Sequence, residues 1–322
     1  MSYTKLNMVG AINACLAQEL EHDQDVVIIG EDVGRDGGVF RVTEGLLDRF
    51  GPSRVIDTPL AELGIVGAGV GMATYGLRPV VEIQFMGFIY EAFEQVFSHA
   101  ARMRSRTRGR FTCPLVIRTP YGIGIKAPEL HSESSEAVFC HIPGLKVVVP
   151  SSPYNAKGLL ASAIRDDDPV LFLEPSRLYR AIKVDVPDEP YTIALGKADI
   201  FQDGKDLTII AWGAMLHKAA EAAEGLDAEI IDLLTLKPYD EETILNSVKK
   251  TGRVVIVHEA TRIGGYGAEI AAFVGEEAFG YLKAPVVRVA GPEAVTPMAQ
   301  LEDEYRPSLE RIKKAYERTL SF

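Results

Sequence analysis

The stretch Asp57-Thr-Pro-Leu-Ala-Glu62-Leu-Gly-Ile-Val-Gly67-Ala-Gly-Val-Gly71-Met72 decides the fold of this chain, because it joins a strand to a glycine-rich helix. The β-branched run 54–57 leads into it, and Pro59 ends that strand because proline offers no N–H to a neighbouring strand. We expect a buried helix that begins near Glu62, and from there the apolar residues continue without a charge as far as Arg78. Each glycine inside a helix costs about 1 kcal/mol relative to alanine, so these glycines predict a close backbone approach to another group.

Glu62 opens that helix, and two interpretations of its carboxyl group follow. An acidic residue in the first turn is stabilised by the helix dipole, so Glu62 is explained as a capping carboxylate on a tightly packed helix. The alternative is a buried carboxyl group that meets a ligand. The helical pattern by itself leaves both interpretations open.

The composition of the 322-residue chain is that of an ordinary globular protein, with 47% hydrophobic and 25% charged residues. This length predicts two domains. The net charge of −11 argues against general binding of nucleic acid. One basic run, from Arg102 to Arg110, is typical of a solvated helix end, with a contact to an acidic partner or a phosphate as the alternative.

Cysteine usage and the N-terminal sequence indicate a cytoplasmic protein. Cys15, Cys113 and Cys140 are widely spaced and form no C-x-x-C motif, which is typical of a reducing compartment. Residues 1–8 lack the charged-then-apolar pattern of a signal peptide. No apolar run is suited to span a bilayer, so we expect no contact with a membrane.

Continuous Val, Ile and Leu runs mark the predicted strands, with predicted helices between them. Strands that are apolar on both faces are typical of a parallel sheet wound with helices. The strands are expected at 26–30, 54–57, 78–85, 114–118, 145–149, 169–174, 207–213, 228–234, 254–259 and 285–289. Among the helices, one is expected from Tyr90 to Met103, one is capped by Thr43, and one is capped by Asp240.

The expected fold class is therefore α/β, with two doubly wound domains at 1–182 and 196–322. A polar stretch with two prolines, 183–195, is expected to link them. Catalytic groups in a parallel sheet lie in the loops beyond the carboxyl ends of the strands. Glu62 and His131 each lie in a segment that follows a predicted strand, so we expect them to converge on one edge of the first sheet.

The sequence motifs of three other enzyme classes do not match this chain in detail. A dinucleotide fingerprint would need its third glycine at Met72 and a tight turn from the strand, whereas about ten residues intervene. The sequence has no G-x-S-x-G elbow, no Walker loop and no H-x-x-x-H pair. A dinucleotide enzyme, a serine nucleophile and a metal-dependent hydrolase are therefore not supported.

The spacing from Glu62 to Gly67 and Gly71 is similar to the pyrimidine-domain motif of thiamine-diphosphate enzymes. Further phrases resemble the β subunit of the decarboxylating component of 2-oxo acid dehydrogenase complexes, of the pyruvate or branched-chain type. This resemblance covers essentially the whole chain. Its phrases are Glu31-Asp32-Val-Gly34, Asp57-Thr-Pro-Leu-Ala-Glu62, Glu82-Ile-Gln-Phe85, Pro128-Glu-Leu-His131-Ser, Pro143-Gly-Leu-Lys-Val-Val-Val-Pro150, Ala156-Lys-Gly-Leu-Leu and Ala211-Trp-Gly213.

The resemblance implies a pyrimidine-type thiamine-diphosphate-binding domain followed by a transketolase C-terminal-like domain. It implies that Glu62 bonds a ring nitrogen of the cofactor's aminopyrimidine and exchanges a proton with it. Phe88 matches the aromatic position that packs on this ring, with plain core packing as the alternative, and Gln84 is expected behind these groups. His131 matches the family's active-site histidine, which would transfer a proton or orient the acyl group during its handover to the lipoyl arm.

No Gly-Asp-Gly occurs in this chain, although thiamine-diphosphate enzymes usually use that motif to hold Mg²⁺ and the diphosphate. The resemblance therefore implies a separate α subunit that holds thiamine diphosphate and Mg²⁺, in an α₂β₂ heterotetramer. It also implies a β–β contact and docking of the lipoyl acyltransferase core through its subunit-binding domain. Glu293 and the terminal carboxylate at Phe322 match docking positions, with ordinary solvation as the alternative. Asp166 and Asp168 match a potassium site, and a polar turn explains them equally well.

The expected reaction is the oxidative decarboxylation of a 2-oxo acid with reductive acylation of a lipoyl group. The phrases resemble both branched-chain and pyruvate enzymes, and we expect branched-chain or mixed specificity. One alternative is an acetoin dehydrogenase β subunit. The other is a non-catalytic assembly subunit, against which the presence of both Glu62 and His131 argues.

Overall fold

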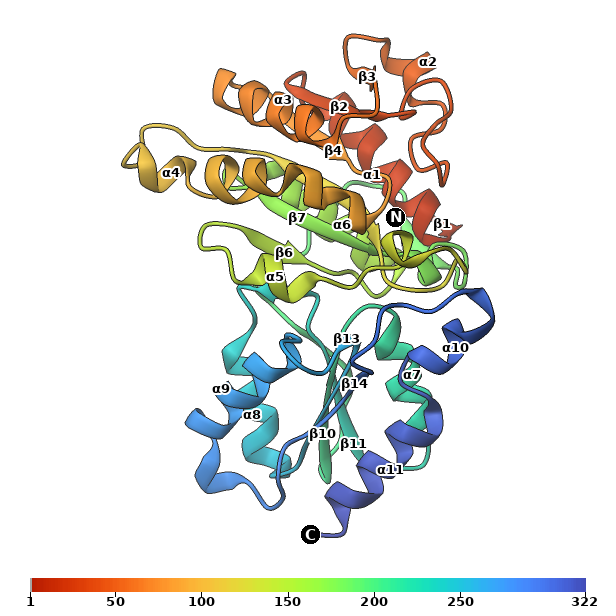
Figure 1. Ribbon diagram of the computed structural model, residues 1–322, viewed down its shortest axis with the longest axis vertical. Helices are drawn as coiled ribbons and strands as arrows, with labels where there is room; N and C mark the ends of the chain where they lie inside the picture. Colours follow the sequence, from red (N-terminus) through yellow and green to blue (C-terminus); the bar gives the residue numbers. More distant parts are fainter. Residues whose placement is uncertain (1) are drawn as a thin grey trace.

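The computed structural model describes residues 2–322, which form two helix-covered sheets one above the other in Figure 1. Within these residues the larger sheet has seven strands in the order β12-β6-β7-β5-β4-β2-β3. Only β12 is antiparallel to its neighbour. The strands are β2 (Val26–Glu31), β3 (Val55–Thr58), β4 (Arg78–Glu82), β5 (Val116–Tyr121), β6 (Lys146–Val148), β7 (Val170–Pro175) and β12 (Thr235–Lys237).

Helices cover both faces of this larger sheet, because alternate apolar side chains of each strand point to opposite faces. Ile28 lies in one buried cluster with residues of α1 (Met8–His22) and α6 (Pro153–Arg165). Ile29 lies in another cluster with residues of α3 (Glu62–Tyr75). The second cluster also includes the 3₁₀ helix η1 (Met86–Ala92), the π-helix η2 (Gln95–Ala100) and α5 (Glu136–Cys140).

The smaller sheet has the order β14-β13-β10-β11-β9, and only β9 is antiparallel. Helices α7 and α11 share a buried cluster with one face, and α8 and α9 share one with the other. The bounds are β9 (Asp199–Gln202), β10 (Leu207–Ala211), β11 (Ala228–Asp232), β13 (Val254–Thr261), β14 (Val287–Gly291), α7 (Ala214–Ala222), α8 (Glu241–Thr251), α9 (Gly267–Glu277) and α11 (Leu309–Leu320).

Shorter elements connect these layers. They are β1 (Tyr3–Leu6), α2 (Leu46–Phe50), α4 (Met103–Arg106), η3 (Glu129–His131), η4 (Ser176–Leu178), β8 (Val184–Pro187), η5 (Phe279–Tyr281), η6 (Ala299–Leu301) and α10 (Glu302–Tyr305). Within residues 2–322, none of the helices combines the length and the apolar composition that crossing a bilayer requires.

The two halves of the chain share strands and core. β12 follows β11 of the smaller sheet but pairs with β6 of the larger one. Trp212 and Ile231, from the second half, lie in the same buried cluster as Val147 of the larger sheet. One apolar core therefore continues from one sheet to the other.

The expected α/β class with two helix-wound sheets is confirmed. The helix expected at 90–103 is wrong as a single element, because η1, η2 and α4 replace it. The segment stays helical, but its hydrogen bonds follow the 3₁₀ pattern in η1 and the π pattern in η2.

The structure contradicts one of the two expected helix caps. Thr43 does not cap α2, because its hydroxyl donates to the Val33 carbonyl at 2.7 Å and the helix begins only at Leu46. The segment 183–195 contains β8, which pairs antiparallel with β1, and its role as the linker between two domains stays a prediction. Asp240 does cap α8, since its carboxylate accepts from the Thr243 N–H at 3.2 Å.

Candidate functional site

Glu62 is the first residue of α3, and its side chain is only 8% exposed. The N-cap of this helix is Ala61, and no side chain caps the helix terminus by a hydrogen bond. Glu62 therefore lies in the first turn of α3, where the helix dipole stabilises a carboxylate, so the capping interpretation stays open. The burial of this carboxyl group also fits the alternative interpretation, in which it meets a ligand.

Close packing explains one glycine of α3 but does not explain another. A Cβ added at Gly69 would lie 2.7 Å from Cγ2 of Val81, so this glycine lets the helix approach β4. A Cβ at Gly71 would meet nothing within 4 Å. The helix is therefore pressed against the sheet on one side and open on the other.

A cavity of about 440 Å³ lies at the start of α3. Its lining consists of apolar side chains and two carboxyl groups, namely Leu60, Ala61, Glu62, Leu63, Gly87, Phe88, Glu91 and Leu130. These residues come from the turn before α3, from the first two residues of α3, from η1 and from η3. Such a lining suits a flat heterocycle with a basic ring nitrogen, because apolar walls hold the ring and a carboxyl group meets the nitrogen. No Lys or Arg is among these lining residues, so they do not suit a diphosphate.

His131 lies beside this cavity among aromatic rings. Its ring centroid is 4.5 Å from that of Phe85 and 5.0 Å from that of Phe88. A side chain at Gly87 would fall on the backbone of Leu130, so glycine is what lets η1 and η3 touch. The Nδ1 atom of His131 is buried and has no hydrogen-bond partner within residues 2–322.

The structure thus brings Glu62, Phe88 and His131 together, as the strand order predicts. Phe88 links the other two, since it lines the Glu62 cavity and packs edge-on against His131. Phe85 and Leu130 complete the group and were not predicted as site residues. Phe85 directly follows the predicted Gln84 and Leu130 directly precedes the predicted His131, which was the available signal.

Gln84 lies outside the lining of this cavity. Its side-chain amide donates to Asp32 at 3.4 Å, at the carboxyl end of β2. Burial raises the pKa of the neighbouring Glu31, and the charges of Asp32 and Glu62 raise it further. Gln84 therefore belongs to a carboxyl-rich strand edge behind the cavity.

A buried ion-pair group joins three neighbouring strands of the larger sheet. Arg118 of β5 donates to Glu82 of β4 at 2.7 Å and to Glu174 of β7 at 2.7 Å. Tyr179 also donates to Glu174, at 2.6 Å. Burial raises the pKa of Glu82, while Arg118 lowers it. Sequence reasoning did not single out this group, although charged residues that end apolar strands were a visible signal.

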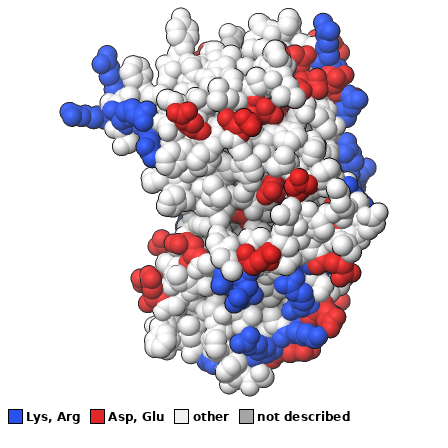
Figure 2. Space-filling view, in the orientation of Figure 1, with Lys and Arg blue, Asp and Glu red and all other residues white. Residues whose placement is uncertain are grey.

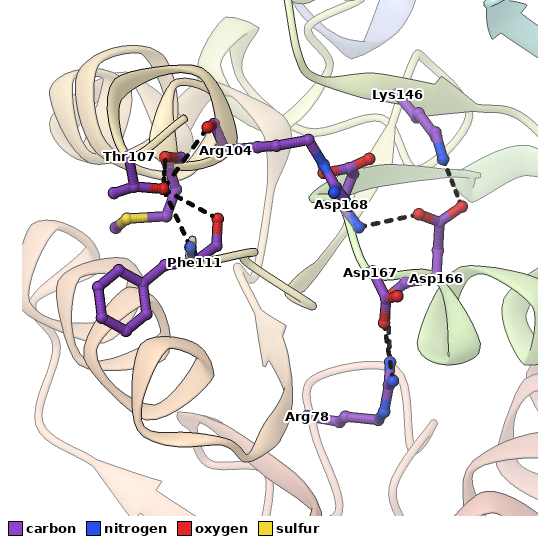
Figure 3. Close-up of polar contacts among 9 residues, drawn as sticks. Arg78, Arg104, Thr107, Phe111, Lys146, Asp166, Asp167 and Asp168 are labelled. Carbon is purple, nitrogen blue, oxygen red and sulfur yellow. Dashed lines mark hydrogen bonds and ion pairs between the residues drawn. The ribbon is translucent and has the colours of Figure 1, made fainter. Parts of the chain in front are cut away.

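Asp166 and Asp168 lie in the turn before β7, and each carboxylate forms a salt bridge with a Lys or Arg side chain (Figure 3). Asp166 accepts from Lys146 at 2.5 Å and from the Asp168 N–H at 2.9 Å. Asp168 accepts from Arg104 at 2.7 Å. Within residues 2–322, no cluster of three or more His, Cys, Asp or Glu suits a metal ion. Potassium at these positions stays a prediction.

The basic run 102–110 forms a projecting tip of the molecule at the left of Figures 1 and 2, where Lys and Arg side chains gather. Thr107 closes this tip, since its hydroxyl donates to the Met103 carbonyl at 2.8 Å and accepts from the Phe111 N–H at 3.0 Å. Arg104 fixes the tip to Asp168. The run is therefore an exposed helix end, and its contact with an acidic partner or a phosphate stays a prediction.

Glu293 and Phe322 do not lie together. The Glu293 carboxylate accepts from the Ile263 N–H at 2.6 Å, close to the carboxyl end of β14. Arg311, in the first turn of α11, donates to Ala290 of β14 at 2.6 Å, so this strand end is near the start of that helix. Phe322 is 64% exposed at the other end of α11, which is about 18 Å long.

Family models match the chain in two stretches. The transketolase pyrimidine-binding domain matches residues 4–182, and the transketolase C-terminal domain matches residues 196–312. A split-gene transketolase, an inactive β4 tetramer, superposes with a TM-score of 0.81 at 24% identity, covering 99% of each chain. The expected pyrimidine-type and transketolase C-terminal-like folds are confirmed.

Curated relatives match along almost their full length. The pyruvate dehydrogenase E1 component subunit beta of Acholeplasma laidlawii is 51% identical over 321 residues, covering 98% of each chain. The protein of the same name from Bacillus subtilis (strain 168) is 49% identical over 323 residues, covering 99% of each chain.

Proposed function

We propose a function from the premise that this chain belongs to the family of pyruvate dehydrogenase E1 β subunits, which have transketolase-like domains. The chain is one half of a 2-oxo acid dehydrogenase component and acts with thiamine diphosphate and a separate α subunit. Together the two subunits decarboxylate a 2-oxo acid oxidatively and transfer the acyl group to a lipoyl arm. The names of the relatives support this reaction over that of an acetoin dehydrogenase.

The cavity at the start of α3 is the observation that carries this proposal. When bound, thiamine diphosphate supplies the electron sink that decarboxylation requires. The carboxyl group of Glu62 binds a ring nitrogen of the aminopyrimidine and holds or releases a proton there. Phe88 and Leu130 line the same cavity, cover the ring and exclude water from Glu62.

The α subunit binds, in this proposal, against the outer face of α3. Leu60 and Tyr75, just before and at the end of this helix, are 70% and 90% exposed. Gly71 has open space beside it, so a partner backbone can approach closely there. Because the lining of the cavity lacks a cation, the α subunit must supply the groups that hold the diphosphate and Mg²⁺. An α₂β₂ heterotetramer with a β–β contact follows from the same family premise.

His131 acts, in this proposal, on the acyl group as it passes to the lipoyl arm. Its position between Phe85 and Phe88 fixes the plane of the ring, and Phe88 connects it to the cofactor cavity. A histidine held in this way orients the acyl group or transfers a proton near neutral pH.

Pyruvate is the substrate that the relatives support, in place of the branched-chain or mixed specificity that we expected from the sequence. A panel of pyruvate, 2-oxoglutarate and branched-chain 2-oxo acids with the reconstituted heterotetramer tests this choice. The largest kcat/KM should belong to pyruvate. A higher value for a branched-chain acid would return the assignment to the original expectation.

The lipoyl acyltransferase core docks, in this proposal, on the second domain. Both expected docking positions, Glu293 and the terminal carboxylate at Phe322, are exposed. The carboxylate of Glu293 already accepts a hydrogen bond from Ile263.

The proposed role of Glu62 is tested by replacing it with alanine in the reconstituted heterotetramer. The Glu62→Ala variant should lose about 100-fold or more of the 2-oxo acid-dependent reduction of a dye, which is the usual size of a general acid–base effect. Glu94→Gln, an exposed carboxyl group on the following helical segment, is the control and should stay near the parent rate. Near-parent activity of Glu62→Ala would refute the assignment.

A further inference from the structure

The segment 122–134, here called the His131 loop, connects β5 to α5 and carries His131. Gly122, Gly124 and Lys126 all have positive φ, of 79°, 145° and 57°. Lys126 is the least suited of the three to such a conformation, because its Cβ crowds the backbone there. A loop with this backbone needs fixed partners outside itself to keep a single position.

Glu259 of β13 holds both ends of the His131 loop. The side chain of Glu259 is 6% exposed and belongs to the smaller sheet. Its Oε1 atom accepts from the Ile123 N–H at 2.6 Å and from the Ser134 hydroxyl at 3.2 Å. A Cβ added at Gly122 would fall against this same oxygen, so the loop backbone passes directly over the carboxyl group.

Glu302 holds the middle of the loop. It is the first residue of α10 and is 2% exposed. Its Oε2 atom accepts from the Lys126 N–H at 2.7 Å, at the residue with the unfavourable backbone conformation. The second half of the chain therefore supplies two buried carboxyl groups to backbone N–H groups of one loop in the first half.

The opposite side of the loop rests on the candidate site. Leu130 lies against Gly87 of η1, and His131 lies against Phe85 and Phe88. The loop is thus clamped between η1 and the two carboxyl groups. Neither Glu259 nor Glu302 lines the cavity that contains Glu62, so any influence on the reaction must pass through the loop.

We propose that Glu259 and Glu302 are positioning residues that fix the His131 loop, and with it the imidazole of His131, against the cofactor cavity. The link to the reaction rests on the function proposed above, in which His131 serves the transfer of the acyl group to the lipoyl arm. The anchoring itself rests only on the contacts of the two carboxyl groups.

The test uses the α-reconstituted enzyme with Glu259→Ala, Glu302→Ala and their glutamine counterparts. Glutamine keeps an oxygen that accepts hydrogen bonds, whereas alanine does not. Asp240→Asn is the matched control, because Asp240 is a buried carboxyl group that accepts from the Ala198 and Thr243 N–H groups, both at 3.2 Å, away from the loop.

Two readouts are measured on each variant. Hydrogen exchange of a peptide that covers 122–134 should rise at least tenfold in both alanine variants and stay within threefold of the parent in the glutamine variants and the control. Acylation of a free lipoyl domain should fall at least tenfold in the alanine variants, while reduction of a dye by the same enzyme falls less. Adding Glu259→Ala to His131→Ala should cause no further loss of acylation, because both changes act through one imidazole.

Several results would overturn the proposal. Unchanged loop exchange in the alanine variants would show that the carboxyl groups do not hold the loop. Equal losses of dye reduction and acylation, together with faster exchange throughout the second domain, would show a general structural role. If the loop loosens but His131→Ala itself leaves acylation unchanged, the anchoring stands and the proposed role of His131 falls.

Discussion

Glu136 illustrates at the residue scale how this chain uses buried carboxyl groups. The side chain is fully buried, one oxygen accepts from the Trp212 indole at 3.4 Å, and the other has no partner within residues 2–322. Burial raises the pKa of Glu136 to about 8, and the nearby Glu259 adds to this effect. The carboxyl group is therefore protonated at neutral pH, since a neutral group costs far less to bury than a charged one.

The pH dependence of stability follows from this shift. Because the pKa of Glu136 in the folded chain lies above its ordinary value of 4.5, its contribution to stability is fully present below about pH 4.5 and is lost as the pH rises toward 8. Glu136→Gln removes this loss. Its stability relative to the parent should rise by about 1 kcal/mol per pH unit between pH 5 and 8.

Thermal unfolding of the parent and the Glu136→Gln variant at several pH values, followed by circular dichroism, checks this prediction. The unfolding midpoint of Glu136→Gln minus that of the parent should increase as the pH rises. Parallel curves would show that Glu136 does not change its protonation on folding.

Sequence reasoning reached Glu62, Phe88 and His131 because each lies in a short local motif. It missed Glu136 and Glu259 because their burial depends on which parts of two sheets meet. The residues next to a carboxyl group in the sequence do not indicate that it will be buried against the other half of the chain.

At the scale of elements, one ion-pair group holds three strands of the larger sheet together. Arg118→Met would leave Glu82 and Glu174 buried without their cation. We expect a loss of about 3–5 kcal/mol in stability, because breaking a buried pair leaves uncompensated charge. Arg104→Ala breaks the half-exposed pair with Asp168 and should cost at most about 1 kcal/mol. Equal shifts in the urea midpoint of the two variants would contradict the account.

The contact between η1 and η3 depends on Gly87. A methyl group there would collide with the Leu130 backbone, which has no cheap way to move, so Gly87→Ala should displace His131. We expect about a tenfold loss of lipoyl acylation, as for a small misplacement of a reacting group. Gly275→Ala in α9 is the control, since a Cβ there meets nothing within 4 Å and alanine favours a helix. Full activity of Gly87→Ala would show that this contact does not position His131.

The order of strands and helices was predictable because strands covered on both faces are continuous apolar runs. Runs such as Val26–Glu31 and Val254–Thr261 carry that signal clearly. The short β12 does not carry that signal, and its partner β6 lies almost ninety residues earlier in the sequence. Pairing over such distances is set by the assembled core and not by local pattern.

At the scale of the whole molecule, the second half of the chain serves the site without entering it. Glu259 and Glu302 reach the His131 loop from sequence positions more than one hundred residues away. One buried cluster contains both Trp212 and Val147, so the two halves of the chain share one apolar core. The division of the chain into two domains at 183–195 stays a prediction.

The central claim is that this chain holds one half of a cofactor site. The most direct test titrates the purified chain with its α subunit and measures pyruvate-dependent dye reduction in the presence of thiamine diphosphate and Mg²⁺. The account predicts no turnover by either chain alone and activity that rises to a plateau at one α subunit per chain. Turnover of pyruvate by this chain alone would contradict it.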